Sequence, residues 1–289
     1  MVNLLYIDYN NTNQGEIAME KKVVLVTGAS AGMGKETAKQ LAQMGYKVYG
    51  AARRVEKMED LRSLGVTPLM LDITREDQCQ EVVDTIMKNE GQIDVLVNSA
   101  GFGLYGSVED TPIADARYQF EVNMFGLAAI TRMVLPGMRK RKSGRIVNIS
   151  SMGGKMYTTL GAWYHATKHA LEGWSDCLRV ELKGFGIDVV VVEPGGIKTE
   201  WGGIAMEKLA KISGNGPYAA IAGKVAQGSH ALEKNLSSVD EIAKEIVKAS
   251  TVKKPKTRYL KGFMAKPLVS MRNFLGDRGF DNLLLSQLK

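Results

Sequence analysis

Six short apolar runs, each followed by an amphipathic stretch, limit the folds that are open to this chain. The runs are "KVVLVTG" (22–28), "KVYGAAR" (47–53), "VTPLMLD" (66–72), "IDVLVNSAG" (93–101), "GRIVNISS" (144–151) and "IDVVVVEPGG" (187–196). Their apolar, β-branched residues are typical of strands that are buried on both faces of a sheet. Helical patterns lie between the runs, at 33–44, 55–63, 75–90, 112–139 and 161–185. This alternation predicts an α/β fold with a doubly wound parallel sheet, which binds ligands beyond the carboxyl ends of its strands.

The chain is expected to form one domain, because no stretch rich in proline, glycine or serine divides its 289 residues. We place this domain at 19–262. Within it, 197–236 is rich in Gly, Ala and Met and is predicted to form a lid over the ligand site. Residues 1–18 are polar and rich in Asn, and "MEKKVVLVTGAS" resembles a protein start at Met19. This predicts either a disordered leader or a start codon assigned too early, with an ordered arm as the alternative.

Residues 263–289 are predicted to form a basic, amphipathic helical tail. Apolar residues recur there with helical spacing, and the pattern breaks around Gly276 and Gly279 into a pair of helices. Two interpretations stay open. The tail docks on the domain and roofs the site, or it binds the surface of an anionic membrane peripherally.

Charge and cysteine content exclude several classes of protein. The formal net charge is +7, and residues 252–289 account for it with nine Lys and Arg against two Asp. Because the rest of the chain balances near zero, the charge distribution argues against a uniformly basic nucleic-acid-binding protein. No apolar run approaches the ~20 residues of a membrane span. Cys79 and Cys177 are too few for a disulfide framework and are interpreted as buried small hydrophobes, which favours a cytoplasmic protein.

A glycine-rich turn, "TGASAGMG" (27–34), follows the first strand and opens the first helix. Gly28 allows a tight turn, while Gly32 and Gly34 let the backbone approach a diphosphate and pack the helix closely. The amino end of the helix offers free N–H groups and a partial positive charge. The turn therefore predicts a dinucleotide site and a Rossmann fold, with a purely structural turn as the alternative.

The end of the second strand, "YGAARR", predicts which dinucleotide binds. Proteins that bind NAD usually place Asp or Glu there to hold the ribose hydroxyls, whereas this chain has Ala52. Arg53 and Arg54 follow, and a guanidinium binds a 2′-phosphate through charge-assisted hydrogen bonds. We therefore predict NADP(H) rather than NAD, with Arg53 as the main contact, Arg54 as the second and Ser30 assisting.

Seven motifs in order give the chain a resemblance to a known family. They are "TGASAGMG", "LDIT", "NSAG", "VNMFG", "IVNISS", "YHATK" and "EPGGIKT". From about residue 21 to about residue 260 the chain resembles the short, non-extended type of short-chain dehydrogenases/reductases, and most closely their steroid- and retinol-type NADP-dependent oxidoreductases. The family writes "NNAG" where this chain has "NSAG", so Ser99 is a mild departure.

The resemblance implies a set of cofactor contacts along the strand ends. Asp72 and Ile73 would cover the adenine, whereas Pro194, Gly195 and Ile197 would wall in the nicotinamide. The full set is Gly28, Ser30, Gly32, Met33, Gly34, Arg53, Arg54, Asp72, Ile73, Asn98, Ala100, Gly101, Tyr164, Lys168, Pro194, Gly195, Ile197 and Thr199.

The resemblance also implies four catalytic residues. Tyr164 and Lys168 stand four apart, hence on one face of a helix. A free phenol has a pKa of about 10, and a nearby ammonium lowers it, so that Tyr164 can serve as general acid and base. Lys168 would also hold the nicotinamide ribose, Ser151 would position the substrate oxygen, and Asn123 would hold a water that links Lys168 to solvent.

His165 and His169 also stand four apart, which raises the alternative of a metal site. Position 166 is Ala, so the "HExxH" glutamate is missing, and the helical step turns both histidines away from Tyr164 and Lys168. No metal site is therefore predicted. The histidines are interpreted as packed or surface residues, with a subunit interface as a further alternative.

The predicted activity is hydride transfer between NADP(H) and a carbonyl compound or secondary alcohol. The segments 102–108, 152–161 and 197–236 would set specificity and favour an apolar sterol, retinoid or fatty substrate. Their apolar lining is Phe102, Leu104, Met152, Met156, Tyr157, Leu160, Trp201, Met206 and Tyr218. Alternatives are a catalytically silent dinucleotide-binding regulatory protein and a basic nucleic-acid- or membrane-binding protein. The resemblance further implies a homodimer or homotetramer paired through helices 112–139 and 161–185.

Overall fold

The computed structural model describes residues 21–288, so the predicted leader, 1–18, lies outside the described residues. Within that range, seven parallel strands form one sheet in the order β3-β2-β1-β4-β5-β6-β7. The strands are β1 (Val23–Thr27), β2 (Lys47–Ala52), β3 (Val66–Met70), β4 (Val95–Asn98), β5 (Gly144–Ile149), β6 (Ile187–Pro194) and β7 (Arg258–Lys261). The doubly wound, single-domain fold is thereby confirmed, and all six predicted strands form.

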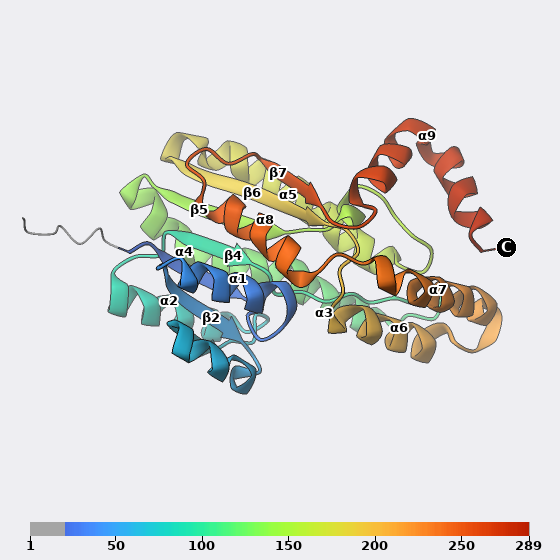
Figure 1. Ribbon diagram of the computed structural model, residues 1–289, viewed down its shortest axis with the longest axis horizontal. Helices are drawn as coiled ribbons and strands as arrows, with labels where there is room; N and C mark the ends of the chain where they lie inside the picture. The colour runs from blue at the N-terminus through green and yellow to red at the C-terminus, as the bar shows by residue number, and fades with distance from the viewer. Residues whose placement is uncertain (1–20, 289) are drawn as a thin grey trace, which may run out of the picture.

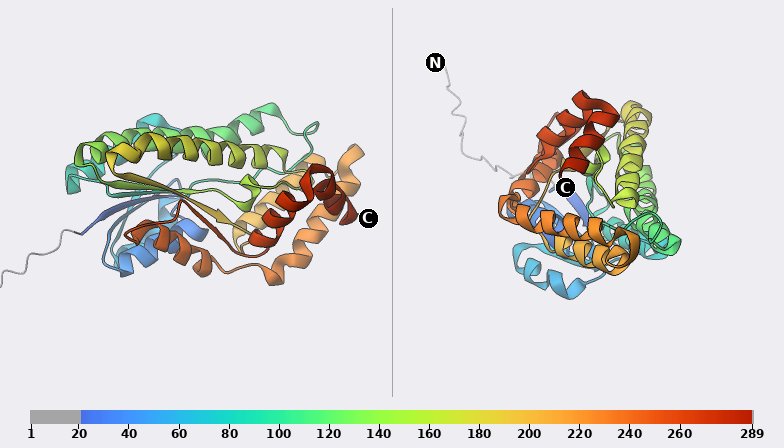
Figure 2. Two further views of the ribbon diagram at one scale, coloured as in Figure 1. Left: turned by 90° about the horizontal axis from the view of Figure 1, so that it is seen from above. Right: turned by 90° about the vertical axis from the view of Figure 1, so that its right-hand side faces the viewer.

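Helices cover both faces of the sheet. The helices are α1 (Gly32–Gln43), α2 (Glu76–Glu90), α3 (Ile113–Phe120), α4 (Leu127–Arg141), α5 (Ala162–Leu182), α6 (Glu200–Ser213), α7 (Ala219–Leu232), α8 (Val239–Thr251) and α9 (Ala265–Ser286). Short helical turns are η1 (Val55–Leu64), η2 (Glu121–Gly126), η3 (Met152–Gly154), η4 (Lys183–Phe185), η5 (Gly216–Tyr218) and η6 (Glu233–Asn235). Helices α1 and α8 lie on one face, and α2, α4 and α5 lie on the other (Figures 1 and 2).

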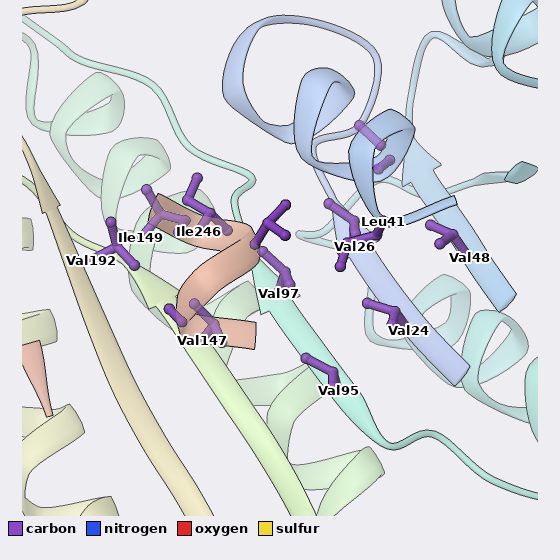
Figure 3. Packing of buried hydrophobic residues seen from close by; sticks show 14 of the residues in the cluster. Val24, Val26, Leu41, Val48, Val95, Val97, Val147, Ile149, Val192 and Ile246 are labelled. Atoms are coloured by element: carbon purple, nitrogen blue, oxygen red, sulfur yellow. The ribbon is translucent and has the colours of Figure 1, made fainter. Parts of the chain in front are cut away.

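The core divides into two layers because alternate residues of each strand point to opposite faces. In β1, Val24 and Val26 pack toward α1 and α8, as Figure 3 shows together with Leu41 and Ile246. The intervening Val23 and Leu25 pack in the other layer, against side chains of α2, α4 and α5. Burial on both faces explains why the strands are apolar runs without an alternating pattern.

The predicted helix 112–139 is divided in the structure. α3 and α4 are separated by η2, a π-helical turn that contains Asn123. A π-helical turn inserts extra backbone into the helix, and such turns concentrate near functional sites. The predicted helix 55–63 is also different, because η1 has the tighter 3₁₀ geometry.

Elements α8 and β7 were absent from the sequence prediction, and one cysteine prediction is wrong. Cys79 is buried as expected, but Cys177 is exposed on the outer face of α5. The segment 197–236, expected to be less regular, contains α6 and α7. These two helices and α9 gather at the end of the molecule to which the strands point (Figure 1).

The tail forms α9, which bends at Gly276 (φ 64°, ψ −170°), as the broken pattern predicted. Its second half attaches to the segment after η3. Phe280 is 0% exposed and its ring lies 5.3 Å from that of Tyr157, whose hydroxyl donates to Asp281 at 2.7 Å. In the part of the chain that the structure describes, no helix is long and apolar enough to cross a bilayer.

Candidate active site

The glycine turn is as tight as the sequence predicts. Gly28 has a φ of 71°, and a Cβ there would stand 2.8 Å from the Ala100 backbone. A Cβ on Gly34 would stand 2.5 Å from the Gly28 carbonyl oxygen, so the start of α1 packs directly on the turn. Among the described side chains, none caps the α1 N-terminus. The first N–H groups of α1 therefore lack a side-chain cap, and such N–H groups can bind phosphate oxygens.

Two cationic side chains lie beyond the end of β2. Arg53 and Arg54 are exposed, and within residues 21–288 neither forms an ion pair with a carboxylate. Arg53 Nη1 donates to the Tyr118 hydroxyl at 3.0 Å. Ser30 lies half-buried in the glycine turn. These groups fit an anionic substituent on the ribose, such as a 2′-phosphate.

The end of β3 brings Asp72 and Ile73 to the same edge. Asp72 Oδ1 accepts hydrogen bonds from the backbone N–H and the hydroxyl of Thr74, at 3.0 and 2.8 Å. Ile73 is buried, and its carbonyl oxygen lies so close to η2 that a Cβ on Gly126 would approach it to 2.3 Å. The contact fixes η2 beside the end of β3.

The structure does not bring the Asn98 side chain to this edge. Asn98 is the last residue of β4, and its buried side chain donates to Thr131 Oγ1 on α4 at 3.0 Å and to Asn148 Oδ1 on β5 at 2.9 Å. Ala100 and Gly101, which follow it, do reach the edge. Ala100 lies against Gly28, and a Cβ on Gly101 would stand 3.2 Å from Asn123 Oδ1.

The segment after β6 runs along the same edge. The Gly195 N–H donates to the Lys261 carbonyl at 2.8 Å, which ties the turn after Pro194 to β7. Ile197 packs against the core layer of α1 and α8, as does Met33. Thr199 accepts from the Trp201 N–H at 3.3 Å, and its methyl carbon would lie 3.7 Å from a Cβ on Gly32. Thr199 therefore stands next to the glycine turn.

Helix α5 places Tyr164 and Lys168 on one buried face. Lys168 Nζ is 6.0 Å from the centroid of the Tyr164 ring and donates to the Ile149 carbonyl at 2.8 Å. Ser151, just beyond β5, accepts from the Gly153 N–H at 3.0 Å and also hydrogen-bonds Tyr164. Phenol, ammonium and serine hydroxyl thus meet at the carboxyl edge of the sheet.

Asn123 lies at the π-helical turn beside this group. Its Oδ1 accepts from the Phe102 N–H at 3.1 Å, and its Nδ2 donates to the Phe102 carbonyl and to Thr167 Oγ1, at 3.0 and 3.1 Å. The buried amide therefore ties η2 to the segment after β4 and to α5.

The acidity of Tyr164 differs from the sequence expectation. Burial raises the pKa of the Tyr164 phenol well above its usual range, Tyr105 adds to this, and a hydrogen bond from Ser151 acts in the opposite direction. Burial likewise lowers the pKa of Lys168 to about 8, while Glu172 acts to raise it. The direction for Tyr164 is therefore opposite to the expected lowering by Lys168, because the loss of solvation on burial is the largest influence on the pKa of the phenol.

Two aromatic rings cover Tyr164. The ring of Trp201, in the first turn of α6, lies 5.3 Å from the Tyr164 ring, and the ring of Tyr105 lies 6.0 Å from it. Trp201 also meets Tyr105 edge-on at 6.2 Å. Trp201 was among the predicted lining residues. Tyr105 was missed, although it belongs to the segment 102–108 that was expected to set specificity.

Other predicted lining residues are distributed differently. Leu104 and Met156 are buried, whereas the hydroxyl of Tyr218 donates to Glu109 at 2.8 Å on the surface. Phe102 lies beneath the ammonium of Lys208, 4.5 Å from its ring centroid, which adds a further contact between α6 and the segment after β4.

The histidine pair does not converge. His165 is buried, with its Nδ1 2.9 Å from the Gly153 carbonyl and its Nε2 2.9 Å from Thr158 Oγ1. His169 is exposed, and its Nδ1 lies 2.9 Å from the carbonyl of His165. Across residues 21–288, no group of three or more His, Cys, Asp or Glu side chains is arranged to hold a metal ion.

A tight glycine turn that opens a helix, and a buried phenol at the same edge of a doubly wound sheet, are characteristic of oxidoreductases that use a nicotinamide dinucleotide. The family-level comparison agrees, because the family model described as short chain dehydrogenase matches residues 22–209. The chain belongs to the short-chain dehydrogenase family.

Individual relatives match most of the chain. A probable short-chain type dehydrogenase/reductase, VdlC, of Helicobacter pylori is 34% identical, and the match covers 90% of this chain and 96% of the relative. An NADPH-dependent 3-dehydrocapnine reductase of Ornithobacterium rhinotracheale is 31% identical, covering 93% and 98%. The crystal structure of a short-chain dehydrogenase from Streptomyces avermitilis is 34% identical with a TM-score of 0.77, covering 86% and 92%.

Proposed function

We propose that this protein is an NADP-dependent reductase that transfers hydride between NADP(H) and a carbonyl compound or secondary alcohol. One observation carries the proposal: Tyr164 and Lys168 share a buried face of α5, with Ser151 hydrogen-bonded to the phenol. The catalytic domain of the proposal is 19–262, with 197–236 as its substrate lid.

Tyr164 is the general acid and base of the proposed reaction. Because burial raises the pKa of its phenol, Tyr164 holds its proton at neutral pH. A protonated phenol is the form that donates to a carbonyl oxygen, which favours reduction. Ser151 positions that oxygen, Lys168 holds the nicotinamide ribose, and Asn123 supports the supply of protons. The bound cofactor supplies or accepts the hydride.

Arg53, with Arg54 and Ser30, is proposed to bind the 2′-phosphate that distinguishes NADP from NAD. Support comes from Ala52, which replaces a carboxylate at the end of β2, and from two guanidinium groups that no carboxylate neutralises within the described chain. The relative whose name specifies NADPH dependence supports the same choice.

The proposed substrate is an apolar carbonyl of sterol, retinoid or fatty type. Trp201 and Tyr105 present ring faces beside the Tyr164 phenol, so a substrate that reaches the phenol contacts aromatic carbon. Burial of apolar surface against such rings stabilises binding by about 25 cal/mol per Å².

Assembly as a homodimer or homotetramer through the helical segments 112–139 and 161–185, which hold α3, η2, α4 and α5, is part of the proposal. Light scattering after gel filtration tests it.

For the tail, we propose docking over the site instead of membrane binding. The fold separates the basic residues: Lys253, Lys254 and Lys256 precede β7, while α9 holds Lys266, Arg272 and Arg278 against two Asp. Equal pelleting with anionic liposomes by the full chain and by a chain ending at Lys261 is the expected result.

Consumption of NADPH over a panel of sterol, retinoid, fatty and small aryl carbonyls tests the reaction. Turnover with at least one apolar carbonyl is expected, and no turnover across the panel would overturn the proposal.

For the cofactor, Arg53→Ala should weaken NADPH binding by about tenfold or more and leave NADH binding nearly unchanged. Arg139→Ala, an exposed change at the end of α4, is the matched control. Equal weakening of both cofactors by Arg53→Ala would contradict the NADP assignment.

A further inference from the structure

Two buried carboxylates lie below the proposed catalytic group. Glu172 is on α5 and Glu193 is near the end of β6, and they are 4% and 3% exposed. Both contact the same two cations. Lys155 Nζ is 3.2 Å from Glu172 and 3.8 Å from Glu193, and Arg258 Nε is 3.1 and 3.2 Å from them. The two buried carboxylates are therefore close neighbours that share both cations.

The closeness of the two carboxylates favours the protonated form of Glu193. Like charges in a low-dielectric site cannot both ionise freely. Burial and the charge of Glu172 raise the pKa of Glu193 to about 7, although Lys155 and Arg258 oppose this. Glu172 Oε1 is buried and has no hydrogen-bond partner among the described side chains and backbone groups. A proton on Glu193 gives that oxygen a donor.

Glu172 also acts on Lys168, which lies one helical turn before it on α5. Lys168 is buried, its ammonium donates to the Ile149 carbonyl, and Glu172 is the group whose charge raises the pKa of Lys168. A carboxylate one helical turn away on the same buried face stabilises the charged form of the lysine.

Other charged residues surround Glu172 and Glu193 on the elements that pack against them. Lys155 follows η3, Arg258 is on β7, and Asp176 is on α5, where Arg258 and Arg179 hold it. Of these groups, Asp176 is partly exposed, and its charge is compensated by two guanidinium groups. Among these acidic groups, Glu172 is the one whose charge acts on the pKa of Lys168.

We propose that Glu172 is a positioning residue that keeps Lys168 charged inside the site, and that Glu193 tunes this effect through the proton that the two carboxylates share. The inference rests on the proposed function, in which the charged Lys168 holds the ribose and faces the phenol. In this proposal Glu172 and Glu193 stabilise the charge of Lys168 without touching substrate or cofactor themselves.

The sign of the effect follows from the charges. Above the pH at which Glu193 ionises, the pair carries two negative charges and favours the ammonium form of Lys168 most strongly. Glu172→Gln removes one charge permanently, so the pKa of Lys168 falls further below its usual value. Activity that needs the ammonium is then lost at a lower pH, and the basic limb of the pH–rate profile shifts in that direction.

The direct test is a titration of Lys168 by NMR in protein labelled at lysine, with the signal assigned by its absence in Lys168→Arg. In Glu172→Gln we expect the Lys168 midpoint, and the basic limb of kcat/KM, to move by about one unit to lower pH. Glu193→Gln should produce a smaller shift in the same direction. Asp176→Asn removes a partner of Arg258 without touching the buried pair, and should leave Lys168 unchanged.

Thermal unfolding is measured for each variant as a control, because loss of an ion pair alone also lowers stability. Glu172→Asp, which keeps the charge, should restore the Lys168 midpoint even if Glu172→Gln folds poorly. An unchanged Lys168 midpoint in folded Glu172→Gln, or a Glu172→Asp variant that shifts as Glu172→Gln does, overturns the inference. The titration needs no turnover, so an inactive wild-type protein would refute the proposed function and leave this test intact.

Discussion

Gly103 leaves room for the indole that covers Tyr164, and replacing it tests the arrangement of the lid. A Cβ at position 103 would lie 2.2 Å from Trp201 Cζ2, 2.9 Å from Cη2 and 3.0 Å from Cε2. The rings of Tyr105 and Tyr164 pack against the indole, with centroids 6.2 and 5.3 Å away, and restrict its movement. In Gly103→Ala the first turn of α6 must therefore shift away from the phenol.

Overpacking of this kind costs about 1–3 kcal/mol. We expect Gly103→Ala to lower the free energy of unfolding by that amount in urea denaturation. In a Trp201→Ala background the obstructing ring is absent, so Gly103→Ala should cost almost nothing. The coupling energy of this double-mutant cycle should then nearly equal the cost of Gly103→Ala alone. Gly202→Ala is the matched control, since no atom lies within 4 Å of a Cβ there.

Two outcomes would refute this account of the lid. One is a Gly103→Ala variant as stable as the wild type. The other is a cost that persists unchanged after Trp201 is removed, which would mean that the indole is not the group in contact. Because the shift moves α6 away from Tyr164, kcat/KM for an apolar carbonyl should fall together with stability in the single variant.

Two further expectations follow from named contacts. Phe280→Ala removes the buried anchor of α9, so limited proteolysis should cut the tail faster, whereas Phe274→Ala, at a side chain that is 89% exposed, should leave the rate unchanged; equal rates in the two variants would contradict tail docking. Hydrogen bonds from Arg258 and Arg179 lower the pKa of Asp176 to about 2, so its stabilising effect is present above its usual pKa of 3.8 and is lost as pH falls toward 2. Asp176→Asn should therefore flatten the stability profile in that acid range, measured by thermal unfolding, and an unaltered profile would argue against the pairing.

The sequence predicts the sheet well, because strands buried on both faces must be apolar throughout. It fails at β7, where Arg258 and Lys261 interrupt the apolar pattern of a short edge strand. Helix α8 had a readable signal, since Ser238 caps the helix by accepting from the Glu241 N–H at 3.1 Å and Glu stands at the third position. The cap could have identified this helix.

The sequence predicts those parts of the site that depend on the spacing of nearby residues. It does not predict the parts that depend on contacts between distant segments. The four-residue step fixes Tyr164 and Lys168 on one face of α5 from sequence alone. Nothing local indicates that Glu172 and Glu193 meet, since only the packing of α5 on β6 brings them together. For the same reason the direction of the Tyr164 pKa could not be predicted, because it depends on how deeply the folded chain buries the phenol.

The π-helical turn is another feature that spacing conceals. A continuous apolar pattern over 112–139 predicts one helix, and the extra residue inserted near Asn123 leaves that pattern almost intact. The turn is evident only in the structure. There the buried Asn123 amide accepts from the Phe102 N–H and donates to the Phe102 carbonyl.

Turnover and cofactor binding by Tyr164→Phe test the central claim most directly. The substitution removes one hydroxyl and keeps the ring, so the contacts with Tyr105 and Trp201 remain. General acid catalysis contributes about 10²–10⁴-fold, so kcat should fall by that factor while the Kd for NADPH stays within about twofold of the wild-type value. A Tyr164→Phe variant that turns over apolar carbonyls at the wild-type rate would contradict the account.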